Sequence, residues 1–313
     1  MSSLMTNSTA MTALQTLRTV SSNMATTQNR IATGYRVATA SDNSAYWSIA
    51  TTMRSDNEAL SAVSDALGLG AATVDTMYTA LTSVVGDNKS GLTALKAKLV
   101  AAREPGVDRG KIQAEVKAIQ DDLKNTSDLA VFNGENWLSV DSSVAGYNAT
   151  KSVVSSFSRV GGTVGIKTID VDTSKLKLYD AAGGTPAGIM DKTRTGAGGT
   201  TGSVATIDIS TLTDSAADQK KLDDYISMVD SALGDVTQAS ANLGAVKTRI
   251  DSNTNFVKSL RDAISRGVGQ LVDADMNAES TRLQALQVQQ QLGIQALSIA
   301  NSGSQSILSL FRG

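Results

Sequence analysis

The chain has 313 residues, enough for roughly two or three small domains, and 28 Lys plus Arg residues nearly balance 30 Asp plus Glu residues. This balance leaves no electrostatic footprint for nucleic acid or an anionic membrane, so we expect neither as a partner. The chain has no cysteine and no histidine, which excludes disulfides, thiolate metal sites and the commonest general base. We therefore expect no enzyme activity, no cofactor and no metal.

Residues 1–29 do not have the form of a secretory signal peptide. They carry a single charged residue, Arg18, and Thr, Ser and Asn interrupt each apolar run. No segment reaches the ~20 mostly apolar residues that span a bilayer. The closest, residues 283–311, is rich in glutamine, whose amides are costly to place in lipid. We expect no membrane insertion, and an export route that does not read such a signal.

Residues 5–138 are predicted to be helical. The first segment ends at Thr33-Gly34, and residues 38–44 are polar and turn-prone. Before that break, apolar and small residues alternate in steps of three and four, as in the seam of a coiled coil. This first seam consists of Ala10, Ala13, Leu17, Val20, Met24, Thr27 and Ile31.

The rest of this block continues the helical pattern. A second seam runs from Leu60 to Val84. Pro105-Gly106 then predicts a turn, and Asp108 is placed to cap the helix that follows. Phe132-Asn133-Gly134 predicts a tight turn that closes the block.

Residues 139–213 change from helical spacing to alternation and are broken by glycine pairs and a proline. The alternation predicts one strand from Val164 to Val171, with a slip near Thr168. A second strand is expected at Leu176 and Leu178, and a third through Val204, Ile207 and Ile209. We expect a small β-rich insert with polar loops.

From about Ser215 helical spacing returns and continues without proline to Leu271. A polar patch from Asp273 to Asn277 predicts a joint, after which helical steps continue to the C-terminus. The predicted fold class is mainly α, with long antiparallel coiled-coil-like helices from both termini and a small β-rich central insert. The last seam consists of Leu283, Leu286, Gln290, Gly293, Leu297, Ala300, Ser304, Ile307 and Phe311.

The two ends of the chain lack the charged stripe that a solvent-facing helix normally has. Residues 283–311 carry no charge, and a second stripe of apolar and small residues runs beside the last seam: Leu292, Ala296, Ile299, Gly303, Ser306 and Leu310. Two such stripes indicate contact with neighbours on more than one side, although two helices of a monomeric bundle remain an alternative. The residues predicted to form this subunit or coiled-coil interface are Leu14, Leu17, Val20, Met24, Ile31, Leu283, Leu286, Leu292, Leu297, Ile299, Ala300, Ile307, Leu310 and Phe311.

Other polar groups have simpler interpretations. Gly196, Gly198 and Gly202 resemble part of a dinucleotide loop but lack its strand-to-helix context, so we interpret them as a surface loop. Asp170 and Asp172 are more typical of a solvated strand face than of a calcium site. The pair Asp223-Asp224, in a helical segment, is expected at the solvated surface.

Four segments resemble bacterial flagellins. Residues 29–43 read NRIATGYRVATASDN, and residues 289–301 read QQQLGIQALSIAN, followed by ILSLFR at 307–312. LGAVKTR at 243–249 and FNG at 132–134 are further family landmarks. The likeness covers about residues 5–138 and 215–313. The pair Tyr46-Trp47 is similar to rhizobial and related alpha-proteobacterial flagellins.

The resemblance implies a structural subunit that polymerises into the bacterial flagellar filament for swimming motility. Implied partners are copies of the same chain, alone or mixed with related flagellins, the flagellar type III export apparatus, an export chaperone and the filament cap. The chain would be secreted and would fold at the growing tip. The implied domains are residues 1–44 and 273–313 in the inner filament core, 45–138 and 214–272 in the outer core, and 139–213 as the exposed variable insert.

Two other functions stay open on the sequence alone. A hook–filament junction protein shares such termini but would assemble only into a short ring. An enzyme or sensor module could use the β-rich insert as a ligand-binding domain, although no residue pattern in the insert supports this.

Overall fold

The computed structural model describes residues 7–160, 163–182 and 186–310, without the side chains of 160 and 304–310. The chain divides into two compact units. The terminal unit combines Met1–Glu58 with Arg261–Gly313, and the middle unit is Ala59–Leu260. Both divisions fall inside long helices, because α2 (Ser44–Val85) and α5 (Ala216–Val272) each contribute residues to both units.

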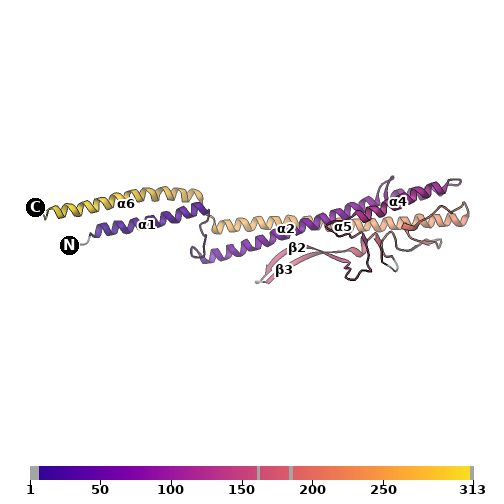
Figure 1. Cartoon of the computed structure of the whole chain (residues 1–313), viewed down its shortest axis with the longest axis horizontal. Coiled ribbons are helices and arrows are strands. Elements are labelled where there is room, and N and C mark those ends of the chain that lie inside the picture. The colour runs from indigo at the N-terminus through magenta and orange to yellow at the C-terminus, as the bar shows by residue number, and fades with distance from the viewer. Residues whose placement is uncertain (1–6, 161–162, 183–185, 311–313) are drawn as a thin grey trace. The chain divides into compact units, whose positions relative to one another are not determined.

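In the terminal unit, α1 (Ser8–Thr33) and α6 (Met276–Leu310) lie side by side and antiparallel, indigo and yellow in Figure 1. Asn7 caps the start of α1, since its side chain accepts a hydrogen bond from the backbone N–H of Ala10. Gly34 ends α1 in the left-handed conformation with φ 74°, which a residue without Cβ adopts at little cost. The predicted break at Thr33-Gly34 is confirmed.

The predicted joint near Asp273 is also confirmed, as the gap between α5 and α6. Backbone hydrogen bonds join this gap to the segment after α1: Arg36 N–H donates to Val272 O at 2.7 Å, and Ala274 N–H donates to Gly34 O at 2.9 Å. A small apolar core lies beside these bonds. It contains Val37, Ala50, Val268 and Val272, with Met53, Ile264 and Leu271 packed against it.

The middle unit is organised around α2 and α5, which run antiparallel (Figure 1). Two shorter helices accompany them, α3 (Gly91–Ala101) and α4 (Arg109–Leu129). Asp108 caps α4 as predicted, by accepting the backbone N–H of Lys111. The predicted second seam is confirmed as a buried face of α2, and α5 contributes a matching row. The buried side chains of these two rows are Leu60, Val63, Leu67, Val74, Met77, Leu81 and Val84, then Leu222, Val229, Val236, Leu243, Ile250 and Val257.

The insert follows the predicted tight turn at Phe132, whose N–H and C=O both bond to Glu135. Its main sheet is an antiparallel hairpin of β2 (Thr150–Val160) and β3 (Thr163–Asp172). Two smaller pairs complete the β structure of the described residues: parallel β1 (Ser139–Val140) with β4 (Tyr179–Asp180), and antiparallel β5 (Arg194–Thr195) with β6 (Thr201–Gly202).

The predicted strand from Val164 to Val171 is confirmed as β3, and the slip has a structural counterpart. The register shifts between Val154 and Ser156 on the partner strand β2, so the irregularity lies in β2 and not at Thr168. On β3, Ile169 and Val171 are buried, while Val164 and Ile166 point to the exposed face.

The second and third predicted strands are wrong. Leu176 follows a 3₁₀ turn at Thr173–Lys175, and Val204 begins another at Val204–Thr206. Their apolar residues are nevertheless buried, including Leu178, Ile207 and Ile209. At the third segment a side chain replaces the strand partner: Gln120 Nε2 on α4 donates to Val204 O at 2.9 Å and Ile207 O at 3.1 Å. At the second, Leu178 N–H donates to Leu138 O at 2.7 Å and Leu178 O accepts from Met190 N–H at 2.8 Å. The alternation of apolar and polar residues in these two segments therefore reflects irregular backbone at 3₁₀ turns, and not strands.

Candidate assembly interface

The helix pair of α1 and α6 has a closed side, where the two helices face each other, and an open side, which faces away from the partner helix. On the closed side, Val20, Thr27 and Leu286 are buried, and the other members of both predicted seams whose side chains the structure describes are half-buried. The seam residues that lie between the two helices are Ala10, Ala13, Leu17, Met24, Thr27 and Ile31 on α1, and Leu283, Gln290, Gly293, Leu297 and Ala300 on α6. One seam of the predicted pair thus joins the two chain ends to each other.

The open side contains the second predicted stripe. Leu292 is 58% exposed and Ile299 is 71% exposed, and Leu14 on α1 is 41% exposed. Four more large apolar side chains, which the seam pattern did not single out, are exposed on the same two helices: Met11, Met276, Val288 and Ile294. Val288 precedes Leu292 by four residues, so helical spacing could have added it to the second stripe.

Three predicted interface residues cannot be assessed. Ile307 and Leu310 belong to α6, but their side chains are not described, and Phe311 lies outside the described residues.

Polar contacts fasten both ends of the helix pair. At one end, Asn7 Nδ2 donates to Ala300 O at 2.9 Å. At the other, Arg30 Nη1 and Glu279 Oε1 form an ion pair at 3.0 Å, with Glu279 buried. No sequence pattern indicates this pair, because Arg30 and Glu279 are 249 residues apart and no local spacing links them. A buried carboxylate is normally paired, so Glu279 required a nearby cation.

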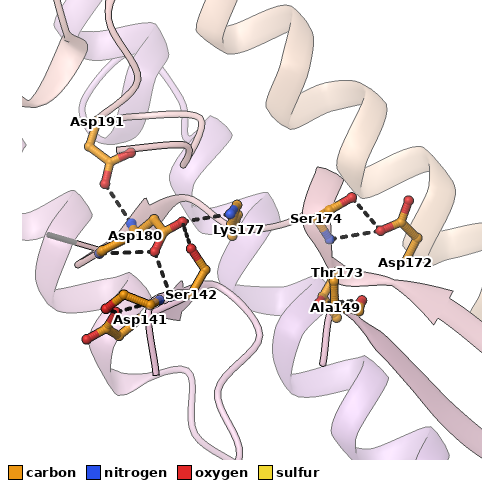
Figure 2. Close-up of polar contacts among 11 residues, drawn as sticks. Asp141, Ser142, Ala149, Asp172, Thr173, Ser174, Lys177, Asp180 and Asp191 are labelled. Carbon is orange, nitrogen blue, oxygen red and sulfur yellow. Dashed lines mark hydrogen bonds and ion pairs between the residues drawn. The ribbon is translucent and has the colours of Figure 1, made fainter. Parts of the chain in front are cut away.

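The insert holds the densest group of buried charges in the described part of the chain (Figure 2). Lys177 Nζ bonds to Asp180 Oδ2 at 2.6 Å, and Ser142 donates to Asp180 through both its N–H and its hydroxyl. Burial by itself would raise the pKa of Asp180, but these hydrogen bonds outweigh it and lower the pKa to about 2. Asp191 accepts the N–H of Asp180, and burial raises its pKa.

The hydrogen bonds of Asp180 join β1 to β4. Asp191 Oδ1 is buried without a hydrogen-bond partner. Asp172 bonds Ser174, and Asp170 bonds Ser152 and Thr168. Among the side chains that the structure describes, no group of three or more acidic residues could hold a metal ion.

The position of Asp224 differs from the one expected from the sequence. The residue is buried, although we expected it at the solvated surface. Its carboxylate accepts the backbone N–H of Gly198 at 2.7 Å and of Thr200 at 3.0 Å, and the hydrogen bond from Gly198 lowers its pKa. Asp224 on α5 thereby holds the glycine-rich loop, which is confirmed as a loop. Its neighbour Asp223 is exposed and pairs with Arg103.

Comparison with known proteins identifies the family. The model of the bacterial flagellin N-terminal helical region matches residues 4–142, and that of the C-terminal helical region matches residues 226–311. Flagellin C of Rhizobium meliloti (strain 1021) is 49% identical over 330 residues, with 100% of both chains covered. A flagellin of Brucella melitensis biotype 1 is 45% identical over 314 residues, again with both chains covered fully. The chain belongs to the bacterial flagellin family.

As a flagellin, it is a structural subunit of the bacterial flagellar filament, and the family assembles by self-polymerisation. The likeness to rhizobial flagellins, first indicated by Tyr46-Trp47, is confirmed. Flagellin A of Rhizobium meliloti is 43% identical over 408 residues. Within the described residues, no helix is long and apolar enough to cross a membrane. In the α1–α6 pair, the closed side joins the two chain ends and the open side exposes apolar residues.

Proposed function

We propose that this flagellin polymerises through the open side of its terminal helix pair. Within one chain, the closed seam joins α1 to α6. The stripe that contains Leu292 and Ile299 then packs on other copies, and Leu14 is a further exposed apolar residue on α1. The observation that carries the proposal is the exposure of these large side chains on helices that are almost free of charge. Exposed apolar stripes of this kind mark interaction sites.

The interface has to be one that propagates. A stripe that packs on a different surface of the next copy makes a heterologous contact, which produces a ring or an open helix and not a closed dimer. An uncharged stripe also avoids repulsion between identical copies stacked at close range. Both properties fit a helical homopolymer, alone or mixed with related flagellins.

The domain roles follow from this arrangement. Residues 1–44 and 273–313 would form the inner filament core, and 45–138 and 214–272 the outer core. Residues 139–213 would form the exposed surface. Family membership supports secretion into the filament through the flagellar type III apparatus, with an export chaperone and the filament cap as further partners. Membership of a family of structural proteins supports a role without catalysis.

Ile299→Asp in the full-length chain tests the interface. A charge buried against a neighbouring copy costs several kcal/mol, so elongation on wild-type filament seeds should slow at least roughly tenfold. Far-UV circular dichroism of the monomer should be unchanged, because Ile299 is exposed. Val144→Asp, at a residue of the insert with comparable exposure, should elongate normally. Normal growth of Ile299→Asp, seen by electron microscopy, would contradict the proposal.

The same seeded assay separates the filament subunit from a hook–filament junction protein. Wild-type chain that adds to seeds and grows long filaments supports the filament role, whereas wild-type chain that cannot elongate favours the junction protein. A chain trimmed of residues 1–29 and 283–313 should form no filaments. Long filaments from the trimmed chain would show that the ends are not the assembly elements.

A further inference from the structure

At Gly293, the backbone of α6 lies directly against the side chain of Leu17. A Cβ atom at position 293 would stand 3.1 Å from both Cγ and Cδ2 of Leu17, which is closer than ordinary van der Waals contact. Both residues are half-buried in the seam. Leu17 thus occupies the space that any side chain at 293 would need.

This contact is in register with the two polar contacts of the helix pair. Asn7 meets Ala300 on one side of it, and Arg30 meets Glu279 on the other. All three contacts therefore fit one antiparallel alignment of α1 against α6, with no axial shift between them.

The rest of the seam specifies its alignment only weakly. Its small and apolar residues repeat at three-four spacing, so a shift of one heptad would bury a similar set of side chains. Such a shift would place Leu286 or Ala300 opposite Leu17, in place of Gly293. Either residue adds a side chain where Leu17 now packs. The shift would also remove Arg30 from the buried Glu279 and leave that carboxylate only its longer contact with Arg282 at 3.7 Å, which is unfavourable.

We propose that Gly293 and Leu17 fix the axial register of α1 against α6, and that Gly293 is a positioning residue for assembly. The assembly part rests on the function proposed above. The register decides which α1 side chains stand beside the open stripe of α6. A slipped pair would present a different surface to the next copy.

The register can be measured directly, because the chain has no cysteine and introduced thiols are therefore unique labelling sites. Nitroxide labels at Ser22→Cys on α1 and Gln287→Cys on α6 use two exposed positions. Double electron–electron resonance then reports the distance between the helices in monomer, and in filaments diluted with unlabelled chain. A slip of one heptad displaces a label by roughly 10 Å along the axis, given the rise per residue.

The wild type should show one distance in filaments, and the same distance in those monomers whose terminal helices are formed. Gly293→Val should show a further population of longer distances, because the two labels are then offset by roughly 10 Å along the helix axis. Its helix content should equal that of the wild type, and it should elongate several-fold more slowly on wild-type seeds. Gly303→Val is the control in the same helix, because nothing lies within 4 Å of a Cβ at that position, and it should keep the wild-type distance. The exchange Leu17→Ala with Gly293→Leu moves the large side chain to the other helix and should restore distance and elongation together.

An unchanged distance distribution in Gly293→Val overturns the inference, and so does a wild type with no single distance in either monomer or filament. Failure of the exchange to restore the distance overturns the assignment to this contact. If Gly293→Val loses helix content, Gly293→Ala, which adds one methyl group, carries the same comparison. A wild type that keeps one distance as monomer but does not elongate contradicts the proposed function and leaves the register intact.

Discussion

Asp180 and Lys177 illustrate how a single pair of residues ties the insert together. Both are buried, and they lie three residues apart in the chain. A buried ion pair is not by itself strongly stabilising, because both charges lose their hydration. Ser142 supplies two further hydrogen bonds to Asp180, so the carboxylate is satisfied (Figure 2). The loss of either partner would leave the other charge buried without compensation.

The depressed pKa of Asp180 predicts a pH-dependent stability. The folded pKa is about 2, below the ordinary value of 3.8, so the carboxylate stabilises the fold at neutral pH and loses this contribution as the pH falls from roughly 5 to 2. The contribution amounts to about 2 kcal/mol. Asp180→Asn should cost about 3 kcal/mol in the free energy of unfolding at pH 6, because Lys177 is left unpaired. The difference from wild type should shrink as the pH falls.

Urea unfolding of both proteins at several pH values from 6 to 2.5 measures that difference. Asp121→Asn is the control, since Asp121 pairs with Lys117 on the exposed face of α4 and should change the stability by less than about 0.5 kcal/mol. A difference between wild type and Asp180→Asn that stays constant over this pH range would rule out the assigned titration.

At the scale of elements, helices followed from the sequence more completely than strands did. The seam of α1, its end at Gly34 and the cap at Asp108 each depend on residues close together in the chain, so local patterns sufficed. Leu176 and Val204 alternate with polar residues like strand residues, yet both lie at 3₁₀ turns. Their partners are distant in sequence, such as Gln120 on α4, and no local pattern announces such a contact.

The candidate interface was predictable to a similar extent. Apolar spacing separated the closed seam of Leu17 and Leu297 from the stripe of Leu292 and Ile299. What spacing could not supply is the alignment of the two helices, because a repeating seam fits itself in several registers. The contact of Leu17 with Gly293 became visible only in three dimensions.

Asp224 offers a test of how the insert is attached to α5. Asp224→Ala removes the acceptor of two backbone N–H groups from the loop at residues 196–200, so that loop should open locally while the helices stay folded. Limited proteolysis followed by mass spectrometry should show faster cleavage within the loop, by several-fold. Asp223→Ala is the matched control, because it breaks only an exposed ion pair with Arg103 and should not change cleavage. Equal cleavage in both variants would show that Asp224 does not anchor the loop.

At the scale of the whole molecule, burial is distributed unevenly between the units. The middle unit buries long rows of side chains on α2 and α5, whereas α1 buries only Val20 and Thr27 fully. Each ordered residue costs conformational entropy, and one narrow seam returns little of it. We therefore expect the terminal helices to depend for their stability on burial against other copies, in coupled folding and assembly.

This dependence predicts that the monomer contains less helix than the filament. The deficit in far-UV circular dichroism should correspond to a large part of α1 and α6, which have 26 and 35 residues. The near-UV signal of Trp137, which is buried in the middle unit, should be the same in both states, because that unit has its own core. Trp47→Phe removes the other tryptophan and isolates that signal. Equal helix content in monomer and filament would mean that the terminal helices fold without neighbours, and that assembly only docks preformed surfaces.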